Sequence, residues 1–160
     1  MNYCPNCGEK LVDTIIDNKQ VKECKKCKYI DWDNWVYLAG VVVAFNNKGE
    51  FLMVKLHDQG KITFPGGYRD IGETVEEAAI REFYEETGNK IKDIELYKTY
   101  TSDKIRLVWV VYKAKIEEVT FQENDEVSEI LFVSKNNPID SKLLRGSLTE
   151  RLYQDILKEL

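Results

Sequence analysis

The stretch Gly66–Asn89 reads GGYRDIGETVEEAAIREFYEETGN, and it decides the fold class and the chemistry of this chain. Thr74 followed by Glu77 is a capping-box signature, in which each side chain accepts the backbone N–H of the other residue. Gly88 supplies the left-handed residue on which helices commonly end. The stretch therefore predicts a glycine-rich turn followed by a helix over residues 74–88.

Three glutamates prolong the apolar face of this predicted helix. At about 100° per residue, the stripe that begins with Val75 and Ala79 continues to Glu82 and Glu86, and Glu85 lies at its edge. Like charges at this spacing repel one another. A hard divalent cation cancels the repulsion and leaves coordination positions for water and phosphate. The cluster therefore predicts a site for Mg²⁺, or for Mn²⁺ in its place, because no soft ligands lie nearby.

Residues around the predicted metal site are suited to handling phosphate. Gly66 and Gly67 let the backbone turn sharply before the helix, and a glycine loop at a helix N-terminus can cradle a phosphate. Glu73 precedes the helix and Arg81 lies beside the carboxylates, so a Glu73–Arg81 pair is expected to brace the ligands. The alternative is an acidic, solvent-exposed helix after a turn.

These residues resemble the Nudix box, G-x5-E-x7-R-E-U-x-E-E-x-G-U, where U is aliphatic or aromatic. The matching positions are Gly67, Glu73, Arg81, Glu82, Phe83, Glu85, Glu86 and Gly88. The last position departs from the pattern, because Asn89 replaces an apolar residue, and Ile91 is expected to take over its packing. The resemblance implies an α+β fold over residues 35–160, the Nudix α/β/α sandwich with a mixed sheet.

The resemblance also implies an activity, the Mg²⁺-dependent hydrolysis of a nucleoside diphosphate linked to another moiety, X. It implies that the metal is bound by Glu82, Glu85 and Glu86 and that Glu73 with Arg81 orients these ligands. The general base varies in the family and is often a glutamate of the helix or of a later loop, where Glu126 is the candidate here. The candidate catalytic residues are Glu73, Arg81, Glu85 and Glu126.

All four cysteines of the chain lie in two C-x-x-C pairs, Cys4 with Cys7 and Cys24 with Cys27. This spacing is typical of a closed, four-thiolate Zn²⁺ site, and residues 10–22 between the pairs read as a hairpin that turns at Asp17. Two disulfides or a redox dithiol are the alternatives. We expect residues 1–31 to form a zinc ribbon that the metal stabilises, because so short a segment cannot build a core alone.

A zinc ribbon ahead of such a box also resembles the NADH pyrophosphatase branch of the family. This implies ADP-ribose, NADH or a related nucleotide as substrate, although residues 96–104 lack the proline-rich motif of that branch. Aromatic residues that are candidates for stacking a base are Tyr68, Tyr100, Trp109 and Phe132. The ribbon is expected to be an appendage; the alternatives are that it forms a wall of the pocket or builds a homodimer.

A non-catalytic alternative is a Nudix-fold nucleotide sensor or adaptor whose ribbon binds a partner or RNA. Sensors tend to lose the box glutamates, whereas this chain keeps them all. The lysines of the ribbon are largely offset by acidic residues, and the formal net charge of the chain is −5. We therefore expect a small-molecule nucleotide as the partner and do not expect nucleic acid.

Composition places the chain among ordinary globular proteins. Its 160 residues are 43% hydrophobic and 32% charged, which suits a buried core and excludes wholesale disorder. The longest apolar stretch, 36–45, is too short to cross a bilayer, and the first residues lack the pattern of a signal peptide. A soluble, cytoplasmic protein without membrane contacts is expected.

The remaining sequence predicts strands and one further helix. The predicted strands span residues 36–45, 50–57, 92–100, 104–116 and 130–133. Ser147 followed by Glu150 is a second capping-box signature, and Leu148, Leu152, Ile156 and Leu160 follow at four-residue spacing.

Overall fold

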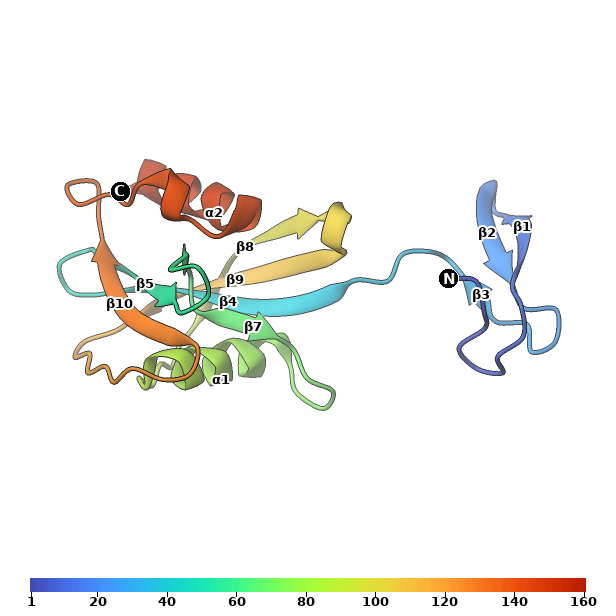
Figure 1. The fold of residues 1–160 in the computed structure, drawn as a ribbon, viewed down its shortest axis with the longest axis horizontal. Helices are drawn as coiled ribbons and strands as arrows, with labels where there is room; N and C mark the ends of the chain where they lie inside the picture. Colours follow the sequence, from blue (N-terminus) through green and yellow to red (C-terminus); the bar gives the residue numbers. More distant parts are fainter. The chain divides into compact units, whose positions relative to one another are not determined.

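The computed structural model describes all residues, Met1–Leu160, and divides the chain into two compact units, Met1–Val36 and Tyr37–Leu160 (Figure 1). No helix in either unit has the length and apolar character needed to span a membrane.

The smaller unit is a three-stranded antiparallel sheet. Strand β1 (Val12–Ile16) pairs with β2 (Lys19–Glu23), and β3 (Ile30–Asp31) adds to the other edge of β2. Asp17 and Asn18 form the turn of the hairpin with φ of 50° and 60°, the left-handed values of a two-residue hairpin turn that matches strand twist. The predicted hairpin is confirmed, whereas β3 was missed because two residues carry no readable periodicity.

The larger unit contains a mixed sheet with the strand order β10-β5-β4-β9-β8. Its strands are β4 (Tyr37–Phe45), β5 (Phe51–Leu56), β8 (Glu95–Ser102), β9 (Leu107–Lys115) and β10 (Val127–Val133). The central pair, β4 with β9, is parallel, and the other pairs are antiparallel. Two short strands extend this sheet, since β6 (Ile62–Thr63) pairs with β5 and β7 (Gly66–Tyr68) pairs with β4. Most predicted strands are confirmed to within a few residues of their ends.

The two faces of this sheet are covered by one helix each, α1 (Val75–Thr87) and α2 (Gly146–Glu159) (Figure 1). A hydrophobic core lies on each face of the sheet, and alternate residues of β4 pack into one or the other. Val41 and Val43 belong to the core that contains residues of α2, whereas Val42 packs in the core with Phe83 of α1. The period-2 alternation of a strand buried on both faces thus produces an α/β/α sandwich, as expected.

The start of α2 differs from the expectation. The predicted Ser147–Glu150 capping box is wrong: the N-cap residue is Arg145, and no side chain caps the helix. Hydrogen bonds to β6 fix this end, since the backbone N–H of Arg145 donates to the carbonyl of Ile62 at 2.9 Å. The buried hydroxyl groups of Thr149 and Thr63 also lie 2.9 Å apart. Leu148, Leu152 and Ile156 are buried as predicted, but Leu160 is exposed.

Candidate active site

Helix α1 begins and ends at the residues that its sequence predicts. The Thr74 hydroxyl accepts the backbone N–H of Glu77 at 3.1 Å, and the Glu77 carboxylate accepts that of Thr74 at 2.7 Å. Gly88 adopts φ of 71° and donates its N–H to the carbonyl of Tyr84 at 2.7 Å. These local bonds fix the rotation and the length of the helix, and with them the positions of its glutamates.

Two glycines allow α1 to lie very close to the sheet. A Cβ on Gly40 would meet the carbonyl oxygen of Val75 at 2.6 Å. A Cβ on Gly67 would meet the carboxyl carbon of Glu82 at 2.3 Å and its oxygens at 2.5 Å. The missing side chain of Gly67 is therefore the space that the Glu82 carboxylate occupies, and the turn before the helix is shaped to receive that group.

Glu86 is the buried carboxyl of the cluster, with 6% of the residue exposed. Its Oε2 accepts the backbone N–H of Gly66 at 2.8 Å. Burial raises the pKa of Glu86 to about 8, and the charges of Glu82 and Glu126 act in the same direction. A carboxylate in this setting is stabilised by a neighbouring cation, because a charge removed from water needs a partner.

The structure brings Glu73 and Arg81 together, as the sequence predicts. Arg81 donates from Nη2 and Nε to the two carboxylate oxygens of Glu73 at 2.7 and 3.1 Å, a bidentate pair. The same guanidinium contacts the Glu82 carboxylate at 2.7 Å and that of Glu85 at 3.1 Å. It also donates to the carbonyl oxygen of Tyr68. The hydrogen bonds that Glu73 accepts from the side chain of Arg81, and then from the backbone of Asp70, lower the pKa of Glu73 to about 2.

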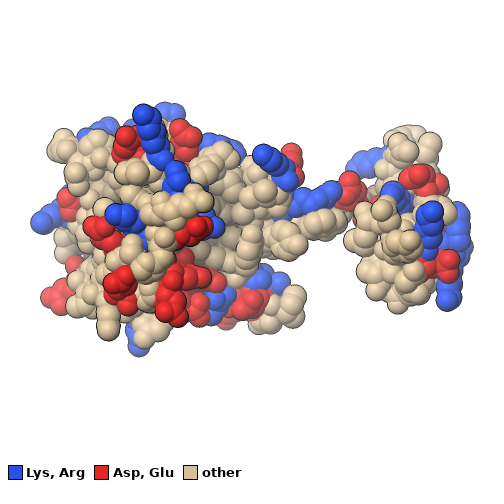
Figure 2. Space-filling model, in the orientation of Figure 1, with Lys and Arg blue, Asp and Glu red and all other residues tan.

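The glutamates differ in environment. Burial raises the pKa of Glu82, whereas the side chain of Glu85 is 56% exposed. Acidic side chains gather on the lower part of the larger unit in Figure 2, where Figure 1 places α1. Glu82 and Glu85 both contact Arg81, whereas Glu86 accepts the backbone N–H of Gly66. The three carboxylates therefore do not form a cluster of ligand atoms within 4.8 Å of one another.

Glu126 lies on a loop that is fastened to the end of α1. The Asn124 amide donates to the carbonyl of Glu86 at 3.0 Å, and its oxygen accepts the backbone N–H groups of Glu126 and Val127. The Asn89 amide brackets the backbone of Thr120, accepting its N–H at 3.1 Å and donating to its carbonyl at 2.8 Å. Sequence reasoning missed both anchors, since an Asn in a polar loop carries no signal of a distant partner.

The departure at Asn89 is thus explained by the loop. Asn89 is buried at the end of the helix, and its amide also donates to the carbonyl of Thr87 at 2.7 Å. Ile91 is buried in the core cluster on the α1 side of the sheet and takes over the apolar role, as expected.

The four cysteines of the smaller unit form a separate cluster of ligand atoms, all within 4.8 Å of one another. The Sγ atoms lie 3.4 to 3.6 Å apart in the pairs Cys4–Cys27, Cys7–Cys24 and Cys7–Cys27. A tetrahedron with Zn–S bonds of about 2.3 Å has edges of roughly 3.8 Å. All four thiols are free of disulfides, so the donor set and its spacing fit Zn²⁺.

The two cysteine turns have the same backbone geometry. The carbonyl of Cys4 accepts the N–H of Gly8, and the carbonyl of Cys24 accepts the N–H of Lys28, each at 2.9 Å. Gly8 and Lys28 both adopt left-handed φ, of 73° and 64°. Two equivalent knuckles therefore present two thiols each, which is the arrangement of a zinc ribbon.

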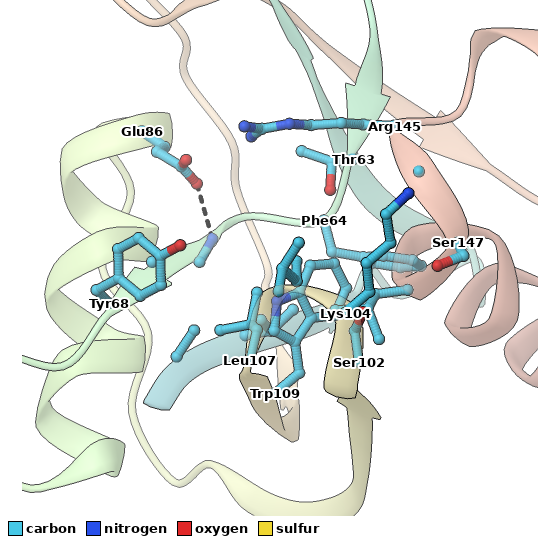
Figure 3. A pocket seen from close by; sticks show the side chains of 17 residues that line it. Thr63, Phe64, Tyr68, Glu86, Ser102, Lys104, Leu107, Trp109, Arg145 and Ser147 are labelled. Carbon is cyan, nitrogen blue, oxygen red and sulfur yellow. Dashed lines mark hydrogen bonds between the residues drawn. The ribbon is translucent and has the colours of Figure 1, made fainter. Parts of the chain in front are cut away.

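A pocket of about 420 Å³ opens beside the carboxylates, on the side of the sheet that α2 covers (Figure 3). Glu86, Gly66 and Gly67 line one end of it, and Phe64, Leu107, Trp109 and Leu148 are among its apolar residues. Of the four aromatic candidates for base stacking, Tyr68 and Trp109 line this pocket. The other two candidates do not line it: Tyr100 is buried and donates to Asp155, and Phe132 is partly buried against the core on the α1 side.

The sequence profile of the NUDIX domain matches residues 37–150. Among curated proteins, the chain is similar to the NAD-capped RNA hydrolase NudC of Haemophilus influenzae (strain PittGG), with 26% identity over 163 residues, 98% of this chain and 60% of the relative. It is also similar to an RNA pyrophosphohydrolase of Vibrio atlanticus (strain LGP32), with 40% identity over 70 residues, 44% of this chain and 40% of the relative.

The chain therefore spans about 60% of the length of the Haemophilus influenzae NudC relatives that it matches. Among solved structures, a NUDIX hydrolase from Nitrosomonas europaea matches with a TM-score of 0.78 and 22% identity, over 99% of this chain and 92% of that chain. A C. elegans Ap4A hydrolase matches with a TM-score of 0.59 and 21% identity, over 73% of this chain and 93% of that chain. These structures have the same fold as the larger unit.

Proposed function

The chain belongs to the NUDIX domain family, and on that premise we propose that it hydrolyses a phosphoric anhydride bond of a nucleotide with Mg²⁺ held by Glu82, Glu85 and Glu86. The observation that carries the proposal is the buried Glu86 at the end of a nucleotide-sized pocket, with Glu82 fitted into the space over Gly67. In an acidic helix on the surface, the carboxyl of Glu86 would not be buried, and the turn at Gly67 would not leave space for the carboxylate of Glu82.

The donor set at this end of the pocket fits a hard cation. It offers carboxylate oxygens only, and Mg²⁺ prefers oxygen ligands, often of one or two carboxylates with waters and phosphate completing the shell. When bound, Mg²⁺ supplies Lewis-acid polarisation of the phosphate and lowers the pKa of the attacking water.

The protein residues have complementary roles. Arg81 holds Glu73 through two hydrogen bonds and reaches Glu82 and Glu85, so the pair keeps the helix glutamates in their rotamers. Glu126 is the proposed general base, because it is exposed on an anchored loop and its charge acts on both Glu82 and Glu86. Glu85 is the alternative base on the helix.

For the ribbon we propose a structural Zn²⁺ held by Cys4, Cys7, Cys24 and Cys27. The buried apolar residues of this unit are Cys4, Leu11, Val21 and Cys24, which are too few to hold three strands together without the metal. A closed site of four thiolates contributes folding energy and leaves no open position for chemistry.

The substrate that we propose is a nucleotide with an internal diphosphate, either free or at the 5′ end of an RNA. The Haemophilus influenzae relative named as an NAD-capped RNA hydrolase matches 98% of this chain, which weighs against the expectation that nucleic acid is not a partner. A 420 Å³ pocket suits a small ligand or a single nucleotide, so the remainder of a larger substrate would lie outside it.

A panel assay tests the function. Purified full-length chain is incubated with Mg²⁺ and, separately, ADP-ribose, NADH, dinucleoside polyphosphates, nucleotide sugars, nucleoside triphosphates and NAD-capped RNA, with Glu86→Gln as the inactive control. Hydrolysis of at least one substrate by the wild type, lost in the control, is expected. Binding of a nucleotide without turnover of any of them would instead support the sensor or adaptor.

A further inference from the structure

Two cations on the wall of the pocket, Lys104 and Arg145, form no ion pair or side-chain hydrogen bond within the protein. Three other basic residues of the larger unit form ion pairs: Arg81 with Glu73, Lys98 with Asp155 and Lys113 with Glu159. Lys104 and Arg145 both line the pocket and both are exposed, and neither side chain makes an ion pair or a hydrogen bond. Cations that face a pocket without a counter-charge are available to an anionic ligand.

Arg145 has a fixed backbone and a free guanidinium. Its N–H donates to the carbonyl of Ile62 on β6, and the preceding Leu144 forms a parallel bridge with the same residue. In Figure 3 its side chain extends across the mouth of the pocket towards the Glu86 end.

Lys104 stands at the other end of the pocket. It lies on the short 3₁₀ helix Asp103–Ile105 that joins β8 to β9. In Figure 3 its ammonium group points towards the side of the pocket where Ser147 lies, in the first turn of α2, and away from Glu86. Trp109 and Leu107 belong to the apolar part of the pocket, below both charged groups in this view. The pocket therefore presents two positive groups, one extending towards Glu86 and one pointing away from it, beside an aromatic and aliphatic surface.

We propose that this pocket binds a nucleoside that carries phosphates at two separate positions, with Arg145 on the phosphate next to Glu86 and Lys104 on the phosphate at the far end. A planar guanidinium suits a bidentate contact with phosphate oxygens, and the Lys104 ammonium supplies a point charge. The apolar floor accepts the base and sugar. Such a moiety occurs in a nucleoside bisphosphate and at the 5′ end of an RNA, where the 3′-phosphodiester is the second anion.

This inference rests on the proposed function for the meaning of the pocket, but it is tested by binding alone. Isothermal titration without Mg²⁺ compares adenosine, AMP and adenosine 3′,5′-bisphosphate as probes on the full chain. We expect the wild type to bind AMP at least tenfold more tightly than adenosine, and the bisphosphate at least fivefold more tightly than AMP, because charged hydrogen bonds commonly exceed a tenfold effect.

The variants separate the two cations. Arg145→Ala should remove most of the gain from adenosine to AMP, and Arg145→Lys should restore part of it. Lys104→Ala should remove the gain from AMP to the bisphosphate alone. Lys48→Ala, in the exposed turn between β4 and β5, is the matched control and should leave all three affinities unchanged. Thermal melts of each variant check the fold.

Equal wild-type affinities for AMP and the bisphosphate, no detectable binding of any probe, or full retention of the second gain in Lys104→Ala would each overturn the proposal. A dinucleotide with a 5′-phosphate is the last probe: binding like the bisphosphate assigns the far phosphate to an RNA chain, and binding like AMP assigns it to a terminal phosphate. Absence of hydrolysis with the binding pattern intact would refute the proposed function and leave this inference standing.

Discussion

Gly67→Ala tests the geometry of the carboxylate site with one added methyl group. The φ of Gly67 is outside the left-handed region, so alanine adds no backbone strain there. Its Cβ would lie 2.3 Å from the carboxyl carbon of Glu82, against an ordinary contact of about 3.5 to 4.0 Å. The Glu82 carboxylate must therefore move by more than about 1 Å, which breaks its 2.7 Å contact with Arg81.

The expected result is a loss of activity with little loss of stability. The displaced atoms are the end of a flexible side chain, so we expect at most about 1 kcal/mol of destabilisation, the lower end of the cost of overpacking. A metal ligand misplaced by 1 Å costs on the order of a hundredfold in kcat/KM. Steady-state hydrolysis of the best substrate from the panel at saturating Mg²⁺, with thermal melts, measures both quantities.

Two controls make the result specific. In a Glu82→Ala background the added methyl group has nothing to displace, so Gly67→Ala should cost no further activity, and the double-mutant cycle should show strong coupling. Gly40→Ala should behave in the opposite way, because its Cβ would meet the backbone oxygen of Val75 at 2.6 Å and destabilise the fold. Wild-type turnover by Gly67→Ala, or additive losses in the cycle, would refute the account of the site.

Four further outcomes are expected. Glu86→Gln should lower kcat by several orders of magnitude while the protein stays folded, since it removes a ligand charge and keeps the shape; near-normal turnover would exclude Glu86 from the site. Protein purified without added metal should contain one Zn²⁺ per chain by elemental analysis, and thiols oxidised without metal would favour disulfides. Deleting residues 1–31 should leave Mg²⁺-dependent hydrolysis in the remaining chain, whereas a rise of more than about tenfold in KM with an unchanged melting temperature would make the ribbon part of the pocket. Arg81 lowers the pKa of Glu73 to about 2, so the pair stabilises the folded protein above pH 4.5, and this stabilisation is lost as the pH falls towards 2. Glu73→Gln should therefore reduce the fall in the free energy of unfolding between pH 4.5 and 2, measured by urea titrations at each pH. The same fall in wild type and variant would refute the role of the pair.

The parts of the structure that could be predicted are those whose causes are local. The caps of α1 are set by Thr74, Glu77 and Gly88 within one segment, and the ribbon hairpin is set by its turn at Asp17. The face of α1 on which Glu82, Glu85 and Glu86 lie follows from helical spacing alone. In these segments the residues that interact are also close in the sequence, so a pattern along the chain predicts the local structure.

The parts that could not be predicted depend on distant partners. Ser147 and Glu150 carry the same cap signature as α1, yet hydrogen bonds from Arg145 and Thr149 to β6 decide where α2 begins. Lys104 and Arg145 enter the pocket from two connections that carry no motif. Only the topology of the sheet brings these residues to the pocket that Glu86 also lines.

The anchors of the Glu126 loop set an unusual rule for how this region can change. Asn89 holds Thr120 only through its backbone N–H and carbonyl, so the identity of residue 120 is immaterial to that bond. Asn124 must then reach the carbonyl of Glu86 from a fixed distance along the chain. Surface loops generally tolerate insertions and deletions. The identity of residue 120 is therefore free to vary at this anchor, whereas the number of residues from 120 to 124 is fixed by the end of α1.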